Sequence, residues 1–342
     1  MSTDPTRVAV VGATGYAGAE LVRLLADHPG ARLAAVTSER DAGRPLGSVH
    51  PTLADTGLEL ESADVSSVAA KAEFAFVALP HGTSAPMVAG LLERGLKVVD
   101  VGADFRLRDR ALYEAWYGEH TQPELLDEAV YGLTEYAREA VAAARLVANP
   151  GCYPTGALFA LLPLGDRLRG PVVVDSKSGT SGAGRAAKTE QLFAEVTENV
   201  RPYGVARHRH QPEIEFHLQA VGAAAADVLF TPHLVPVARG LLSTCYVDVD
   251  PGVDVAGLVA ERYRDEAFVT VCEDGRMPEP RNVRGTNRVE VAAVRHGDSG
   301  RWVVVSAIDN LGKGAAGQAV QNFNLMTGRP EDAGLRLRAA LP

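Results

Sequence analysis

Cysteine is scarce in this 342-residue sequence, and its scarcity argues against two kinds of site. The three cysteines, Cys152, Cys245 and Cys272, lie far apart and show no Cys-x-x-Cys spacing. An odd, scattered set of this kind indicates neither a disulfide framework nor a thiolate metal site, and we expect no metal. Long apolar runs are missing too, since none approaches the roughly 20 residues that cross a bilayer. We therefore expect no membrane segment.

Positive charge is also in deficit. Lysine and arginine total 34 against 43 acidic residues, a net charge of −9, which disfavours nucleic acid as a main partner. The first six residues are polar and lead into a strand-like run, so no signal peptide is visible. With 46% hydrophobic and 23% charged residues, the composition is that of an ordinary globular protein. We expect a cytoplasmic enzyme with a small-molecule substrate.

The order of strand-like and helix-like segments predicts two domains, as the length also does. Residues 7–37 have the pattern of strand, helix and strand, a βαβ unit with a parallel sheet. Further strand-like runs follow within the first 150 residues, so the pattern of residues 1–150 predicts a doubly wound Rossmann-type α/β domain. Strands then dominate residues 151–312, which predicts an α+β domain with a largely antiparallel sheet. A C-terminal helix, about 313–342, is expected to rejoin the first domain.

A glycine-rich turn follows the first strand and opens the first helix. Glycines there let the backbone approach a pyrophosphate, and the helix N-terminus faces the anion. Spacing alone also fits a mere tight turn, but this strand-turn-helix context predicts nucleotide binding. The predicted binding residues are Gly12, Thr14, Gly15, Tyr16, Ala17 and Gly18.

The second strand ends in a turn that bears on the choice of nucleotide. Ser38 and Arg40 suit the 2′-phosphate of NADP, whereas Glu39 would suit the ribose 2′-hydroxyl of NAD. A solvated charged turn is the alternative interpretation. We predict NADP, bound by Ser38 and Arg40.

Cys152 lies in an Asn-Pro-Gly-Cys-Tyr-Pro-Thr-Gly turn, after a strand-like run and before an apolar one. A thiol at a helix start meets unpaired N–H groups and the positive end of the helix dipole, which favours the thiolate. An isolated cysteine is most often a small buried hydrophobe. The turn around Cys152 favours a nucleophile instead.

A histidine pair offers the acid/base group that a nucleophilic thiol needs. His208 and His210 are two residues apart and share a face if the segment is extended. We favour His210 as the base, because it is closer to the helix start at Pro212, and expect His208 to contact substrate or phosphate. Glu213 would either orient the imidazole or complement the helix dipole.

Together these motifs resemble those of the N-acetyl-γ-glutamyl-phosphate reductase family. The further matching segments are Ala78-Leu79-Pro80-His81-Gly82, Asp104-Phe105-Arg106-Leu107, residues 149–155, 177–185 and 208–214, and residues 310–319. They follow one order from residue 8 to about 325, nearly the whole chain. The resemblance implies a fold of the semialdehyde dehydrogenase and glyceraldehyde-3-phosphate dehydrogenase type. It implies NADPH-dependent reduction of N-acetyl-γ-glutamyl phosphate to the semialdehyde, in arginine biosynthesis, by a homodimer or homotetramer.

The resemblance also implies roles for individual residues. Cys152 would carry a thioester that hydride transfer converts to a thiohemiacetal, and helix N–H groups would stabilise the oxyanion. Implied substrate contacts are Arg106 (for the phosphate), Asn149, Ser178, Gly179, Arg185 and His208. Implied cofactor contacts are Pro80, Ser181, Gly182 and Asn310.

Two other functions stay open. A sister enzyme acting on aspartyl phosphate or on a carrier-bound aminoadipate would share the cysteine, the histidine and the nucleotide domain. The Gly-Cys-Tyr-Pro-Thr turn and the His210-Gln211-Pro212-Glu213-Ile214 segment favour the acetylglutamyl enzyme. A catalytically inert nucleotide sensor is a remote alternative, because a sensor needs neither Cys152 nor His210.

Overall fold

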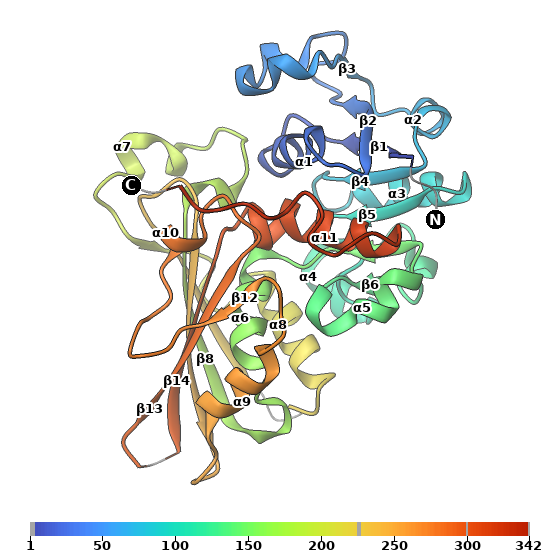
Figure 1. Ribbon diagram of the computed structural model, residues 1–342. Coiled ribbons are helices and arrows are strands. Elements are labelled where there is room, and N and C mark those ends of the chain that lie inside the picture. The colour runs from blue at the N-terminus through green and yellow to red at the C-terminus, as the bar shows by residue number, and fades with distance from the viewer. Residues whose placement is uncertain (1–3, 224–226, 299, 341–342) are drawn as a thin grey trace. The chain divides into compact units, whose positions relative to one another are not determined.

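The computed structural model describes residues 4–223, 227–298 and 300–340 (Figure 1). The chain divides into two compact units. The first comprises Met1–Pro150 and Ala315–Arg336, and the second comprises Gly151–Gly314 and the residues from Leu337.

The first unit is built on a seven-stranded sheet in which every pair of neighbours is parallel. Its strand order is β3-β2-β1-β4-β5-β7-β6. The strands are β1 (Thr6–Val11), β2 (Ala31–Thr37), β3 (Leu60–Glu61), β4 (Phe74–Val77), β5 (Lys97–Asp100), β6 (Val130–Tyr131) and β7 (Leu146–Ala148). Chain order reverses direction at β1 and β4, the switch point beside which doubly wound sheets bind ligands.

Helices cover both faces of this sheet, as its buried, nearly continuous apolar strands require. On one face α2 (Val65–Lys71) and α3 (Ser84–Glu93) pack against alternate strand residues such as Ala75 and Val77. On the other face Phe323 of α11 (Gly317–Met326) packs edge-on to Phe74, 4.8 Å between ring centroids. Figure 1 shows α11, in red, beside α5. The remaining helices are α1 (Tyr16–Ala26), α4 (Arg110–Tyr117) and α5 (Thr134–Ala143).

The last helix is shorter than expected. It ends at Met326, and residues 329–340 contain no helix. Gly328 adopts a positive φ of 69° and Pro330 follows, a combination that stops a helix and cannot continue it. A π-helical turn, Gly312–Ala316, precedes α11.

The second unit holds a mixed seven-stranded sheet of order β12-β13-β14-β11-β8-β10-β9. Its strands are β8 (Leu168–Ser178), β9 (Arg201–Pro202), β10 (Val228–Leu234), β11 (Leu241–Val249), β12 (Val269–Val271), β13 (Val289–His296) and β14 (Arg301–Ile308). Four neighbouring pairs are antiparallel, while β8 with β10 and β12 with β13 are parallel. The predicted fold class, a Rossmann-type sheet plus an α+β unit, is confirmed.

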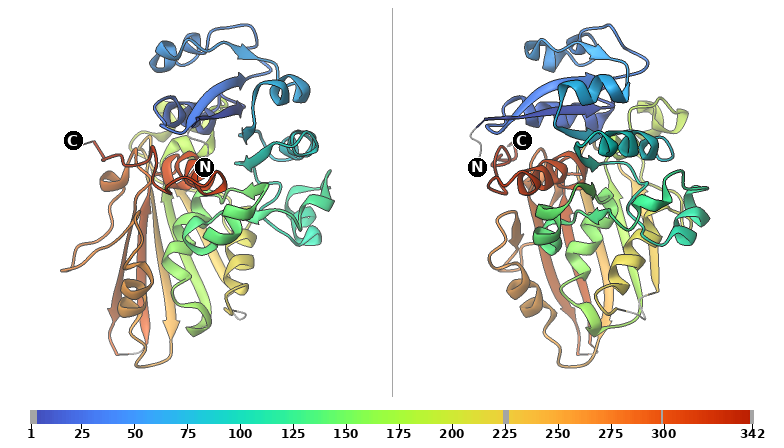
Figure 2. Two further views of the ribbon diagram at one scale, coloured as in Figure 1. Left: turned by 45° about the vertical axis from the view of Figure 1, so that its right-hand side comes forward. Right: turned by 90° about the vertical axis from the view of Figure 1, so that its right-hand side faces the viewer.

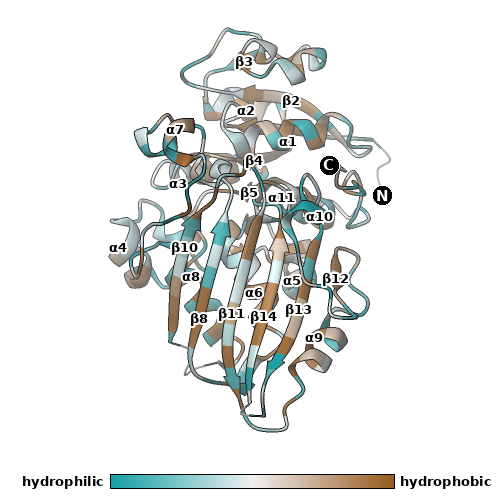
Figure 3. Cartoon of the chain, turned by 90° about the vertical axis from the view of Figure 1, so that its left-hand side faces the viewer, coloured by the Kyte–Doolittle hydropathy of each residue, from teal (hydrophilic) through white to brown (hydrophobic). Residues whose placement is uncertain are grey.

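Helices cover one face of this second sheet. They are α6 (Cys152–Leu161), α8 (His210–Gln219) and α9 (Val255–Tyr263), with short helices at α7 (Phe193–Val196) and α10 (Pro280–Val283). The turned views in Figure 2 show α6 in green and α8 in yellow against the strands. The opposite face, turned toward the viewer in Figure 3, carries the exposed side chains of Leu229, Tyr246 and Val294.

Candidate active site

The turn between β1 and α1 requires glycine at two positions. Gly12 has a φ of +87°, and a Cβ there would lie 2.5 Å from the Ala78 carbonyl oxygen. A Cβ on Gly18 would lie 2.2 Å from the carbonyl oxygen of Gly12. The first turn of α1 carries no acidic residue and Gly15 supplies no side-chain cap, so this helix start suits an anion.

The end of β2 joins this turn to the predicted 2′-phosphate residues. The Ser38 hydroxyl lies 3.1 Å from that of Thr14, so the structure brings two predicted cofactor residues together. Glu39 instead accepts a hydrogen bond from the Ala63 N–H at 2.6 Å, which engages the carboxylate that NAD would need. Arg40 is exposed. His50, which the motifs did not indicate, lies with Nε2 3.0 Å from the carbonyl oxygen of Thr14.

Arg106 and Asn149, both predicted to contact substrate, lie together in the first unit. Arg106 is 9% exposed, and its Nε donates to the Asn149 carbonyl oxygen at 2.9 Å while Nη2 donates to that of Val101 at 2.9 Å. The Asn149 side chain donates to the Ala315 carbonyl oxygen at 3.1 Å. One donor of Arg106 thus holds the backbone that leads to Pro150 and another holds the backbone after β5, a supporting role that the motif alone did not indicate.

In the second unit Cys152 is the first residue of α6, directly after the extended Gly151. The thiol is partly buried, and the first turn of α6 has no acidic residue to oppose a thiolate. Gly314 lies against it: a Cβ on Gly314 would be 2.8 Å from the Cys152 Cβ. The backbone of the glycine-rich segment before α11 therefore packs directly against the nucleophile candidate.

Glu213 joins the starts of α6 and α8. Its side chain is 1% exposed, and Oε1 accepts the Gly151 N–H at 2.8 Å. His210 begins α8, and its ring lies 5.8 Å from the ring of Tyr153, the neighbour of Cys152. Two roles were predicted for Glu213, to orient an imidazole or to complement the helix dipole, and this bond adds a third contact, to the backbone before Cys152. The bond from Gly151 to Glu213 ties together the two helix starts that carry the predicted nucleophile and the predicted base.

His208 sits in an aromatic cluster rather than in a cationic one. Its ring centroid lies 5.6 Å from that of Tyr153, 5.4 Å from Tyr203 and 5.4 Å from Phe230. Burial, with a smaller contribution from the Arg209 charge, lowers the pKa of His208 to about 4. At neutral pH the imidazole is uncharged, and its Nδ1 accepts the His210 N–H at 3.2 Å. A contact with substrate or phosphate, as predicted for His208, would therefore be a neutral hydrogen bond.

The glycine-rich segment after β8 joins the loop before α11. Asn310 donates from Nδ2 to the Ser181 hydroxyl at 2.9 Å and accepts the Gly240 N–H at 2.8 Å. A Cβ on Gly179 would meet the backbone of residues 238–239 at 2.9 Å, so this position also requires glycine. Ser178 is buried beneath Gly182, 2.9 Å from its Cβ position. Arg185 is exposed.

Asp309 is a buried residue of this loop that sequence reasoning missed. It is 0% exposed and pairs with Arg239 at 2.9 Å. It also accepts the N–H groups of Leu311 and Gly312, each at 2.8 Å. An acidic residue before Asn-Leu-Gly was the only signal available, and it did not reveal these partners. Asp309 fixes the loop that carries Asn310 and Gly314.

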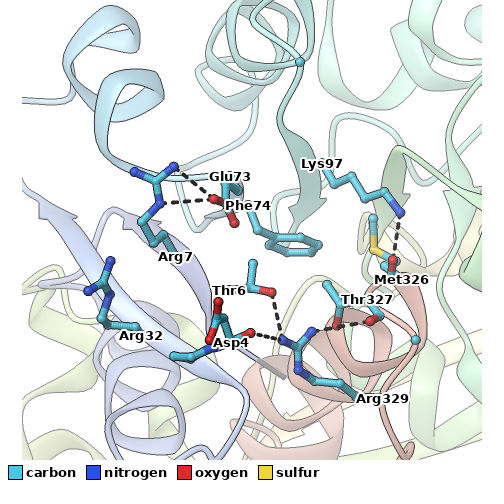
Figure 4. Close-up of a pocket in the computed structure, with 13 residues that line it drawn as sticks. Asp4, Thr6, Arg7, Arg32, Glu73, Phe74, Lys97, Met326, Thr327 and Arg329 are labelled. Carbon is cyan, nitrogen blue, oxygen red and sulfur yellow. Dashed lines mark hydrogen bonds and ion pairs between the residues drawn. The ribbon is translucent and has the colours of Figure 1, made fainter. Parts of the chain in front are cut away.

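A separate cavity of about 950 Å³ lies at the amino ends of the strands of the first unit. Figure 4 shows that its cations mostly bind neighbouring groups. Arg7 pairs with Glu73 at 2.9 Å, Lys97 donates to the Met326 carbonyl oxygen at 2.7 Å, and Arg329 donates to Thr6 at 3.0 Å. Doubly wound sheets bind nucleotides at the carboxyl ends, so this cavity is distinct from the turn at Gly12.

Within the described ranges, no three His, Cys, Asp or Glu side chains gather as a metal ion would require. Nor does any helix of the described part of the chain combine the length and apolar character needed to cross a membrane.

Comparison with known proteins defines the class first. Residues 7–144 match the model of the semialdehyde dehydrogenase NAD binding domain, and residues 152–310 match that of the semialdehyde dehydrogenase dimerisation domain. Aspartate semialdehyde dehydrogenase II of Vibrio cholerae, solved in complex with ASA, has a TM-score of 0.75 at 20% identity, covering 95% of this chain and 99% of its own. The enzyme of Candida albicans with NADP has a TM-score of 0.70 at 17% identity, with coverage of 95% and 99%. The fold is that of the semialdehyde dehydrogenases, a class of oxidoreductases.

Sequence relatives define the family within that class. N-acetyl-gamma-glutamyl-phosphate reductase of Geobacter metallireducens is 50% identical over 336 residues, 96% of this chain and 97% of the relative. That of Halorhodospira halophila is 49% identical over 341 residues, covering 98% and 99%. The chain belongs to the N-acetyl-gamma-glutamyl-phosphate reductase family, which confirms the resemblance.

Proposed function

We propose that the protein reduces N-acetyl-γ-glutamyl phosphate to N-acetylglutamate 5-semialdehyde and phosphate, with NADPH, as a step of arginine biosynthesis. One observation carries the proposal: the Glu213 bond to Gly151 holds the start of α6, with Cys152, next to the start of α8, with His210. A nucleophile and a base on two joined helix ends suit acyl transfer through a thioester.

The thiolate of Cys152 attacks the acyl carbon, and the carbon–oxygen bond to phosphate breaks, which leaves a thioester and inorganic phosphate. NADPH, when bound, supplies the hydride that reduces the thioester carbon. His210 donates a proton to the resulting oxyanion and takes it back as the carbon–sulfur bond breaks, which releases aldehyde and thiolate. Backbone N–H groups at the start of α6 stabilise the oxyanion.

The residues of the first unit fit NADPH. Within the turn from Gly12 to Gly18, a Cβ on Gly15 would meet only the Gly12 carbonyl oxygen, at 3.7 Å, and this open position suits the close approach of a pyrophosphate. Ser38 and Arg40 are assigned to the 2′-phosphate, and the engagement of Glu39 by Ala63 supports this choice. We assign the other cofactor contacts to Thr14, Tyr16, Ala17, Pro80, Ser181, Gly182 and Asn310.

For the substrate, we assign Ser178, Gly179 and Arg185 as neighbours, with His208 as a neutral donor. Arg106 and Asn149 are assigned a supporting contribution, because Arg106 donates to the Asn149 carbonyl oxygen and the Asn149 side chain donates to that of Ala315. The exposed Arg185 is assigned to the phosphate or the carboxylate, because a guanidinium binds either anion in bidentate fashion.

We further propose that the enzyme works in the cytoplasm as a homodimer or homotetramer. Support comes from the match of residues 152–310 to a dimerisation domain and from the helix-free sheet face with Leu229, Tyr246 and Val294. Light scattering of the protein as it elutes from a size-exclusion column measures the oligomeric state directly, and a monomer at micromolar concentration would contradict this proposal.

The reverse reaction tests the activity. Purified protein receives N-acetylglutamate semialdehyde, NADP and phosphate, with aspartate semialdehyde in a parallel reaction, while NADPH absorbance is followed. We expect a phosphate-dependent signal with the acetylated substrate only. Activity with aspartate semialdehyde alone would favour the sister enzyme, and no signal with either would overturn the proposal. Cys152→Ala, correctly folded, must lose the activity; if it retained full activity, the thioester route would be wrong.

A further inference from the structure

Two buried carboxylates share one serine hydroxyl in the first unit. Asp100 ends β5, Asp104 follows four residues later, and both are 0% exposed. The Ser84 Oγ, at the start of α3, lies 3.2 Å from Asp100 Oδ2 and 2.9 Å from Asp104 Oδ2. The mechanism above uses neither carboxylate.

Asp104 holds the turn between β4 and α3. Its carboxylate accepts the Gly82 N–H at 2.8 Å, the Ala85 N–H at 3.0 Å, the Ser84 hydroxyl, and the Tyr113 hydroxyl at 3.0 Å. The residue before the helix, Thr83, supplies no side-chain cap. Asp104 therefore caps α3 from a distant part of the chain and fixes the turn that begins with Pro80.

Counting protons assigns a charge to each carboxylate. Ser84 has one hydroxyl proton, so it can donate to only one of the two. Asp104 accepts three other groups and is the natural anion. Asp100 then has to donate its own proton to Ser84 Oγ, because two bare oxygens would otherwise face each other in a buried space. The result is a chain from the Asp100 carboxylic acid through Ser84 to the Asp104 carboxylate.

The groups around the pair agree with this assignment. Burial first, and then the Asp104 charge, raises the pKa of Asp100 to about 7, against smaller opposing effects of the Gly102 N–H, Arg106 and Ser84. Burial also raises the pKa of Tyr113, which stays a donor. The remaining titratable neighbour, His120, places Nε2 2.8 Å from the Asp104 carbonyl oxygen.

We infer that Asp100, Ser84 and Asp104 are positioning residues for the cofactor turn at Pro80, and that they hold it fully only while one proton is shared between the two carboxylates. Loss of that proton sets two buried anions against a single hydroxyl, loosens the cap on α3 and weakens NADPH binding. The inference rests on the proposed cofactor site and adds a pH control to it.

The inference is tested by measuring the dissociation constant of NADPH from its fluorescence at a series of pH values from 6 to 8.5. Asp100→Asn keeps an acceptor for Gly102 and donates permanently to Ser84, so its affinity should exceed that of the wild type by at least threefold at pH 8.5 and match it at pH 6. Asp104→Asn places an amide donor against Ala85 and Ser84 and should bind at least tenfold more weakly at every pH. Comparing variants at each pH cancels the ionisation of the 2′-phosphate itself.

Asp64→Asn is the matched control, because Asp64 caps α2 of the same unit by accepting the Ser67 N–H at 2.7 Å. It should follow the wild-type affinity at each pH. An Asp104→Asn protein that binds like Asp64→Asn, or a wild type that keeps a constant ratio to Asp100→Asn, would overturn the inference.

Thermal unfolding without nucleotide separates this inference from the cofactor assignment. The folded pKa of Asp100 lies above its unfolded value of about 4, so the contribution of its proton is present at low pH and is lost as pH rises through 7. The melting temperature of the wild type should fall relative to Asp100→Asn from pH 5 to 7 and run parallel above. A difference in melting temperature between the two proteins that stays constant with pH would refute the shared proton. Failure of the wild type to bind NADPH would refute the cofactor site alone.

Discussion

Replacing Glu213 with alanine removes the acceptor of the Gly151 N–H, a 2.8 Å bond between two buried groups. An unsatisfied buried donor costs about 1–3 kcal/mol. A loss of ~2 kcal/mol would lower the melting temperature of a unit of this size by about 4–8 °C. Because Gly151 directs the start of α6, the Cys152 thiol should also shift relative to His210. Displacements of about 1 Å at a reacting group cost up to ~100-fold in rate, so we expect kcat to fall by roughly 10- to 100-fold.

The assay combines thermal unfolding, kcat and the rate of iodoacetamide alkylation of Cys152. Glu213→Gln retains an acceptor oxygen and should recover most of the melting temperature. Glu215→Ala is the matched control on the same helix, where the carboxylate makes longer bonds, 3.2 Å to Gln211 and 3.4 Å to the Val228 N–H. A Glu213→Ala protein with wild-type kcat and alkylation rate would show that this bond does not position the nucleophile.

Two further predictions concern His208 and the nucleotide turn. The folded pKa of His208, about 4, lies below its unfolded value near 6.5, so the unfolded chain binds the extra proton and stability is lost as pH falls through that interval, by up to ~3 kcal/mol. Urea unfolding should show this loss in the wild type and not in His208→Asn; equal acid sensitivity in both would contradict it. Ser38→Ala combined with Arg40→Ala should weaken NADP by about 10- to 100-fold, the cost of lost charged hydrogen bonds, and NAD much less. Titration of both nucleotides decides, and equal losses would show that the turn does not bind the 2′-phosphate.

Local motifs were predictable because their geometry depends on neighbours in sequence. The strand, glycine turn and helix around Gly12 and Gly18 form one continuous segment, and positive φ and close backbone contacts explain the glycines. The helix start at Cys152 was likewise predictable from its Gly-Cys-Tyr-Pro turn. The fold class and the family, both predicted from such segments, are confirmed.

Partners distant in sequence were not predictable in the same way. Glu213 and Gly151 are 62 residues apart, and Arg106 and Asn149 are 43 apart. A charged residue near a motif indicates that a bond will form, but the fold decides which buried atom receives it. The catalytic, substrate and cofactor assignments of single residues accordingly stay predictions.

The environment of His208 shows the same limit in electrostatic terms. Its sequence neighbours are arginines, whereas its spatial neighbours Tyr153, Tyr203 and Phe230 are aromatic. Burial among these rings lowers the pKa of His208, the nearby Arg209 charge lowers it further, and together they keep the imidazole neutral.

Gly314 has a consequence for how this enzyme tolerates variation. One added methyl would stand 2.8 Å from the Cys152 Cβ, well inside the roughly 3.5–4.0 Å at which carbon atoms rest. The position makes no side-chain contact, so a survey of interactions would rate it as dispensable. Mutational scanning should nevertheless find it among the least permissive sites, because any side chain at residue 314 would collide with Cys152.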